Sequence, residues 1–147
     1  MSYDRWTEGV RLLPEARATV VGPTDAEQVH TSPVSLVTFV AKGELTGGRF
    51  GLFRYDMLPG RGGPGPHLHT TFSESFYVMS GVLTVHDGKG WVQAGAGSFL
   101  HVPERSVHGF RNDSDDPASF LVLFAPAPPR EQFFREIAEI NAAGRKL

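Results

Sequence analysis

Residues 67–81 read HLHTTFSESFYVMSG, and the rest of the sequence is interpreted outward from this stretch. His67 and His69 are two residues apart, so on an extended segment both imidazoles leave the same face and can share one metal ion. Glu74 then supplies a carboxylate, but it has the wrong parity to join them on one uninterrupted strand. The chain must therefore turn or bulge within residues 70–73 if the three side chains are to converge.

A second stretch with a histidine, residues 97–112, reads GSFLHVPERSVHGFRN. His108 opens a β-type run there, and it can join the first group only if the intervening strands pack it opposite. Three neutral imidazoles and one carboxylate suit a divalent transition metal ion such as Fe, Mn, Ni, Co, Cu or Zn. The two stretches together predict one such metal ion as the cofactor, and they leave its identity open.

Short β-type runs separated by turn residues extend on both sides of these stretches, from Val34 to about Phe124. Their spacing is typical of a β-sandwich or β-barrel. The expected strands are Val34–Val40, Phe50–Leu58, Glu74–Ser80, Val82–Asp87, Trp91–Ala94, Ser98–Val102, His108–Asn112 and Ala118–Phe124. The separators are rich in Gly, Pro, Asn and Asp, which are the residues that tight turns require.

The segments that flank this β core, residues 34–124, are predicted to be simpler. Residues 1–33 show no sustained period and are expected to form an extended arm. Residues 130–143 carry apolar side chains at helical spacing before Gly144, which predicts a short helix that docks on the core rather than binding a ligand. Because no linker separates these segments, residues 1–147 are expected to form a single domain.

The composition excludes several classes of function. The 147 residues include 17 glycines and 11 prolines, which disfavours a helix bundle, and no cysteine, which excludes disulfides and thiolate metal sites. A formal net charge of -2 from scattered charged residues offers no surface for nucleic acid or an anionic membrane. We therefore expect a small-molecule substrate as the partner. Since the chain shows neither a secretory signal nor a long apolar run, we expect a cytoplasmic protein.

In these two stretches the sequence resembles the cupin superfamily, whose motifs are G-x5-H-x-H-x4-E-x6-G and G-x5-P-x-G-x2-H-x3-N. The matching positions are His67, His69, Glu74 and Gly81 in the first motif, and Gly97, Pro103, His108 and Asn112 in the second. Two glycine positions depart, because Arg61 and Arg105 occupy them, but neither is a ligand position. The resemblance implies an all-β fold, the cupin-type double-stranded β-helix or jelly-roll barrel. It also implies that the three motif histidines and the glutamate bind the metal.

Strand parity predicts two further side chains in the cavity beside the metal. Phe76 and Phe110 each share the parity of a nearby ligand, so both are expected to contact a substrate. His101, Tyr55 and Tyr77 are further candidates for proton transfer or substrate binding. The sequence does not decide whether these three reach the cavity.

Three functions remain open at this point. We favour an oxygenase resembling the quercetin-dioxygenase-like cupins, in which a small apolar enol or phenol coordinates the metal. In that hypothesis Glu74 binds the metal and also takes the proton of the substrate's hydroxyl group. The alternatives are an isomerase, cyclase or hydrolase that uses the metal as a Lewis acid, and a cupin that binds a small molecule without turnover.

The expected last strand, Ala118–Phe124, is apolar on both faces, so its outer face needs a cover. The arm, the terminal helix or a second subunit could supply it. Because single-domain cupins commonly pair, we expect a homodimer.

Overall fold

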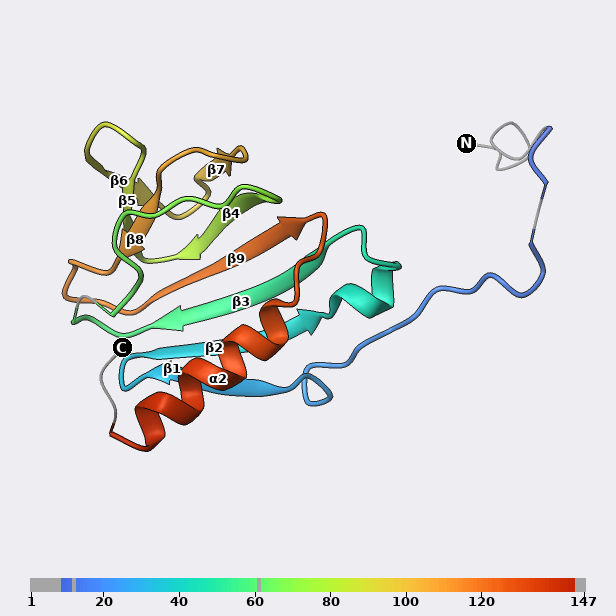
Figure 1. Cartoon of the computed structure of the whole chain (residues 1–147), viewed down its shortest axis with the longest axis horizontal. Coiled ribbons are helices and arrows are strands. Elements are labelled where there is room, and N and C mark those ends of the chain that lie inside the picture. The colour runs from blue at the N-terminus through green and yellow to red at the C-terminus, as the bar shows by residue number, and fades with distance from the viewer. Residues whose placement is uncertain (1–8, 12, 61, 145–147) are drawn as a thin grey trace.

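The computed structural model describes residues 9–11, 13–60 and 62–144, which form two antiparallel β-sheets and a C-terminal helix (Figure 1). The elements are β1 (Gln28–Ser32), β2 (Ser35–Ala41), the 3-10 helix η1 (Gly43–Thr46), β3 (Gly51–Met57), β4 (Ser73–Ser80), β5 (Val82–His86), β6 (Trp91–Gly95), β7 (Phe99–Val102), β8 (Gly109–Arg111), β9 (Ala118–Ala125) and α2 (Arg130–Ala142). The all-β prediction with a short C-terminal helix is confirmed.

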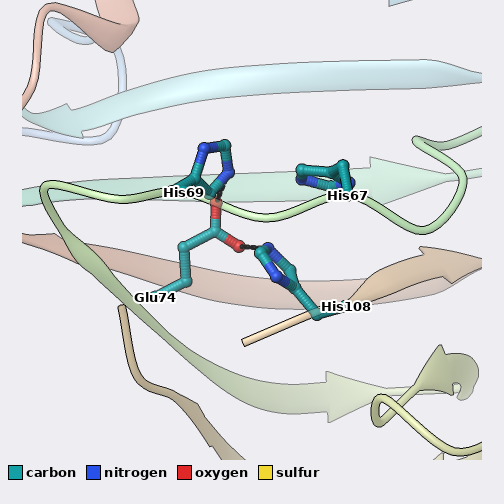
Figure 2. Close-up of side chains that lie close together, drawn as sticks. All are labelled: His67, His69, Glu74 and His108. Atoms are coloured by element: carbon teal, nitrogen blue, oxygen red, sulfur yellow. Dashed lines mark ion pairs between the residues drawn. The ribbon is translucent and has the colours of Figure 1, made fainter. Parts of the chain in front are cut away.

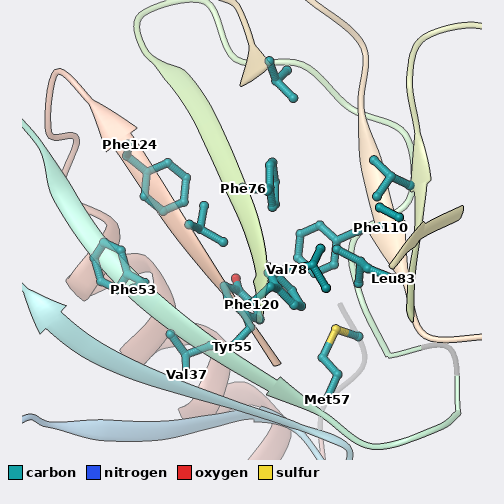
Figure 3. Close-up of a cluster of buried hydrophobic side chains, with 14 of the residues drawn as sticks. Val37, Phe53, Tyr55, Met57, Phe76, Val78, Leu83, Phe110, Phe120 and Phe124 are labelled. Carbon is teal, nitrogen blue, oxygen red and sulfur yellow. The ribbon is translucent and has the colours of Figure 1, made fainter. Parts of the chain in front are cut away.

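The larger sheet has the strand order β1-β2-β3-β9-β4-β7, and the smaller sheet has the order β6-β5-β8. The last strand of the chain, β9, therefore lies between β3 and β4 in the middle of the larger sheet. Its side chains alternate, with Phe120, Val122 and Phe124 buried and Leu121 and Leu123 half-buried on the other face. This alternation packs the phenylalanines into one apolar core between the sheets (Figure 3).

Helix α2 packs against the inner face of the larger sheet and crosses β1 and β2 in Figure 1. Its anchor is Phe134, which is only 2% exposed. The Phe134 ring centroid lies 5.3 Å from that of Phe53, 5.8 Å from that of Tyr55 and 6.1 Å from that of Phe39. In the described part of the chain, no helix is long and apolar enough to cross a bilayer.

The expected arm needs one correction, because residues 28–32 are not an isolated extension. They form β1, which pairs antiparallel with β2 through a tight turn at Pro33. The run QVHTS is mostly polar and gives no clear apolar alternation, so the sequence pattern did not reveal a strand. The described residues before position 25 run away from the sheets in Figure 1, as an arm should.

Candidate metal centre

Four side chains converge on the inner face of the larger sheet: His67, His69, Glu74 and His108 (Figure 2). One possible ligand atom from each of them lies within 4.8 Å of the others. The two segments that carry the histidines are joined by a β-bridge, in which the amide nitrogens of His67 and His108 each donate to the other's carbonyl at 2.8 Å. This bridge explains how two sequence motifs far apart in the chain meet at one point.

Glu74 reaches the same point because the chain bends before β4. Thr70 and Thr71 form bends, and β4 begins at Ser73, so Glu74 enters the sheet facing the histidines. The turn that strand parity required within residues 70–73 is therefore present.

Hydrogen bonds orient two of the imidazoles. The Nδ1 atom of His67 donates to the Gly65 carbonyl at 2.7 Å, and the Nδ1 atom of His108 donates to the Ser106 carbonyl at 3.0 Å. Because a carbonyl only accepts, each Nδ1 carries the proton and each Nε2 keeps a free lone pair. This is the tautomer that a histidine uses to bind a metal through Nε2.

The nitrogens that face Glu74 are short of partners. His108 Nε2 lies 2.7 Å from Glu74 Oε2, and His69 Nε2 lies 3.1 Å from Glu74 Oε1. Both nitrogens are buried, yet neither makes a hydrogen bond of acceptable geometry within the described residues. Two buried imidazole nitrogens without hydrogen bonds, both close to one carboxylate, fit a shared cation, so the residues present suit a divalent metal ion.

The electrostatics of the group favour an anionic glutamate. Burial opposes ionisation of Glu74, which is 4% exposed, but the imidazoles of His108 and His69 outweigh burial and lower its pKa to about 2. Burial also lowers the pKa of His67, which keeps this imidazole neutral near pH 7. The cluster therefore combines an ionised carboxylate with at least one neutral imidazole, a donor set for a hard or borderline divalent ion.

A cavity of about 550 Å³ adjoins this cluster. His67, His69 and Glu74 form part of its wall, and the rest of the wall is mainly apolar, with side chains from the β core and from α2. A second, more open hollow of about 520 Å³ lies between η1 and the start of α2, and none of the four clustered residues lines it. The first cavity is therefore where a substrate could meet the metal ligands.

The structure separates the two phenylalanines that parity placed in the cavity. Phe110 lines it. Phe76 is 1% exposed and is not part of the lining, and its ring packs 5.7 Å from that of Phe110, behind the wall. Phe76 thus supports the wall rather than facing the open space.

Three residues that the sequence left undecided now have positions. Tyr55 lines the cavity. Tyr77 and His101 lie on the opposite face of the larger sheet, where Tyr77 is 47% exposed and His101 Nδ1 lies 2.8 Å from the Ser75 hydroxyl. Of the three, only Tyr55 can act on a molecule in the cavity.

Helix α2 docks on the core as expected, and it also forms part of the cavity wall. Arg130, Phe133 and Phe134 of α2 all line the cavity. The sequence carried a signal for this, since these residues have the i, i+3, i+4 spacing of one helix face and that face contains a charge. A charged side chain on an apolar helix face needs a partner or a function.

Comparisons with known proteins agree with this fold and cluster. Residues 53–124 match the cupin domain family. The quercetin 2,3-dioxygenase of Bacillus subtilis (strain 168) is 40% identical over 73 residues, which cover 50% of this chain and 21% of that protein. The chain thus spans about a fifth of the length of this relative.

Solved structures share the arrangement of strands at low sequence identity. KdgF from Halomonas sp. superposes with a TM-score of 0.67 at 16% identity, covering 77% of this chain and 99% of that one. The polyketide cyclase RemF from Streptomyces resistomycificus gives a TM-score of 0.63 at 21% identity, covering 77% and 82%. The predicted jelly-roll fold is confirmed by these similarities, and residues 53–124 of the chain form a cupin domain.

Proposed function

We propose that this chain is a metal-dependent, dioxygenase-type oxidoreductase that acts on a small, mainly apolar enol or phenol. The observation that carries the proposal is the convergence of three histidines and one glutamate beside an apolar cavity of about 550 Å³, whose wall includes His67, His69 and Glu74. The similarity to a quercetin 2,3-dioxygenase over half of this chain supports the choice of reaction and of a substrate with an acidic hydroxyl group.

The residues of the cluster have separate tasks in this proposal. A divalent transition metal ion held by His67, His69, Glu74 and His108 would supply a Lewis-acidic, redox-active centre. Glu74 is the carboxylate that lines the cavity, so it takes the proton from the substrate's hydroxyl group. Because Glu74 is a weak base, it suits the acidic hydroxyl of an enol or phenol better than that of an alcohol.

The apolar wall has a task as well. Phe110, Val122 and Phe124 line the cavity and exclude water from the reacting end of the substrate. An aromatic or aliphatic substrate body would replace that water with apolar contacts.

Metal content and oxygen uptake test the proposal together. We expect about one equivalent of a transition metal in protein purified without an affinity tag, and loss of that metal in Glu74→Ala and His108→Ala. His101→Ala is the matched control, because this histidine lies on the opposite face of the sheet and its loss should leave the metal in place. The loaded protein should consume oxygen with a panel of flavonols, phenols and 1,3-diketone enols. Metal binding without oxygen uptake on any of these would contradict the dioxygenase assignment.

Tyr55 favours a second candidate, in which the same centre acts as a Lewis acid for isomerisation, cyclisation or hydrolysis. Burial raises the pKa of Tyr55 well above its usual value, so the phenol stays neutral and can donate a hydrogen bond to a substrate oxygen in the cavity. Turnover that needs the metal, consumes no oxygen and is lost in Tyr55→Phe would identify this function. Absence of any metal-dependent turnover would favour a cupin that only binds its ligand.

A further inference from the structure

Arg130, the first residue of α2, places a guanidinium group in the cavity that adjoins the metal ligands. The residue lines the same cavity as His67, His69 and Glu74. Its Nε atom is buried, and no hydrogen bond or ion pair joins the guanidinium to an acceptor among the described residues. A guanidinium carries five N–H donors, so leaving them all without a protein acceptor is costly unless a ligand or water serves them.

Other arginines of the described chain show the contrast. Arg54 pairs with Asp56 at 3.1 Å, and Arg135 pairs with Glu27 at 2.7 Å. These two pairs lie at the surface, where water could have solvated the charge anyway. Arg130 lies in a partly buried position, where the need for an anionic partner is greater, and no carboxylate of the described residues pairs with it.

Aromatic rings hold Arg130 in position without meeting its hydrogen-bonding needs. Its guanidinium carbon lies 3.9 Å from the ring centroid of Phe133, 5.1 Å from that of Phe124, 5.5 Å from that of Phe134 and 5.6 Å from that of Phe72. Cation–π contacts stabilise the charge and restrict the side chain, but ring faces are poor acceptors for N–H groups. The guanidinium is therefore held at the cavity wall without a hydrogen-bond acceptor in the part of the chain that the structure describes.

The charge of the cavity also favours an anion. The groups that interact electrostatically with Arg130 among the described residues are Tyr55, Glu74 and His108, and Tyr55 is neutral near pH 7. Glu74 would give up its share of negative charge to a bound divalent ion, which brings two positive charges of its own. The loaded cavity would then be positive at both ends and apolar between them.

We infer that Arg130 is a substrate-binding residue, and that the substrate carries a carboxylate group at the end remote from its enol or phenol oxygen. The planar fork of the guanidinium matches a carboxylate with two parallel N–H···O hydrogen bonds. A single guanidinium in a phenylalanine-lined wall suits one carboxylate on an apolar body better than a phosphate dianion, which is commonly bound by several donors and cations. The inference rests on the proposed function in locating the substrate here, but the contact with Arg130 does not itself require the metal.

Binding of a matched pair of probes to the full-length, metal-free chain tests this contact. The probes are 4-hydroxybenzoate and its neutral amide, 4-hydroxybenzamide, which carry the phenol and the carboxyl-derived group at opposite ends of the ring and differ only in the carboxylate. Calorimetric titration should show the acid binding the wild type about tenfold more tightly, or better, than the amide. This preference should vanish in Arg130→Gln. It should persist in Arg135→Gln, which removes the same charge from the exposed side of the same helix.

A second variant and two separate measurements complete the test. Arg130→Lys retains the charge but loses the fork, so a partial loss of the preference is expected even if Arg130→Gln does not fold. Equal affinities of acid and amide in the wild type, or a preference that survives in both Arg130 variants, would overturn the inference. Metal content and oxygen uptake are measured separately. A preference for the acid without metal-dependent turnover would support the role of Arg130 and contradict the proposed function. Metal-dependent turnover without a preference for the acid would support the proposed function and contradict the role of Arg130.

Discussion

The Glu74 carboxylate touches two of the three clustered imidazoles, so at the scale of single residues it is the most informative position to change. Glu74→Gln keeps the size of the side chain and removes the charge. Because a divalent ion depends on its anionic ligand, we expect the affinity for Co²⁺ or Zn²⁺ to fall by about 100-fold or more. This loss is larger than the loss expected when only a hydrogen bond to a metal ligand is removed. Competition with a chromophoric chelator measures this.

Glu139→Gln is the control for this change, since it neutralises an exposed glutamate on α2. An unchanged metal affinity in Glu74→Gln would mean that the carboxylate is not a ligand. The fold should survive in both variants, which circular dichroism can verify.

Asp56 provides a prediction about pH at a site away from the cluster. Burial opposes its ionisation, but hydrogen bonds from Arg54 and from the Ser119 hydroxyl, the latter at 2.6 Å, lower its pKa below the usual 3.8. A lowered folded-state pKa stabilises the protein above the unfolded value, and this stabilisation is lost as the pH falls through the folded value. Asp56 is partly exposed, so the contribution is about 0.5 kcal/mol or less.

Thermal melts of the wild type and Asp56→Asn check this sign. The wild type should be slightly more stable at pH 6, and the difference should shrink as the pH drops below 3.8. If the stability advantage of the wild type over Asp56→Asn grows on acidification, the ionised carboxylate of Asp56 is destabilised in the folded state.

The four clustered residues, His67, His69, Glu74 and His108, can be identified from the sequence, because their residue types and the two motif spacings are local properties. The direction of the remaining side chains does not follow as simply. Tyr55 and Tyr77 both occur in β-type runs, yet Tyr55 lines the cavity and Tyr77 faces outward. Parity relates residues within one strand, but it does not state which face of that strand meets the other sheet.

At the scale of secondary-structure elements, α2 depends on one buried aromatic side chain. Phe134→Ala would empty space among Phe39, Phe53 and Phe124, and we expect it to lower the free energy of unfolding by about 3–5 kcal/mol. Urea unfolding followed by circular dichroism measures the loss. Phe133→Ala is the matched control. Phe133 is 40% exposed, so its loss should cost about 1 kcal/mol or less.

Similar losses in the two variants would mean that α2 is not anchored as described.

The bounds of the eight core strands were predicted to within one residue, because turn residues separate the strands and alternation marks their faces. β1 was not, since its polar side chains carry no such alternation and only its pairing with β2 makes it a strand.

At the scale of the whole molecule, one face of the larger sheet carries an apolar patch that we call the outer patch: Leu52, Tyr77, Phe99, Leu121 and Leu123. Phe99 is 65% exposed and Tyr77 is 47% exposed. Helix α2 lies against the inner face of the sheet, so it does not cover this patch. Of the covers that the sequence suggested, a second subunit fits best, and we propose that two copies pair through the outer patch.

Light scattering at micromolar concentration should then give twice the chain mass of 16.0 kDa. Phe99→Glu should shift the mass toward the monomer, because it places a charge in the proposed apolar interface. Val92→Glu changes an exposed apolar residue on the smaller sheet and should leave the dimer intact. A monomeric wild type would refute the dimer, and a dimer that survives Phe99→Glu would place the interface elsewhere.

The strands of the β core, the terminal helix and the four clustered residues can be predicted from the sequence, because turn residues, side-chain periodicity and motif spacing are all encoded over short distances along the chain. Strand β1, the position of α2 and Arg130 in the cavity wall, and the outward direction of His101 follow only from the folded arrangement. These outcomes depend on which faces of distant elements meet. That choice is made by packing all the apolar faces into one core, which no local pattern records.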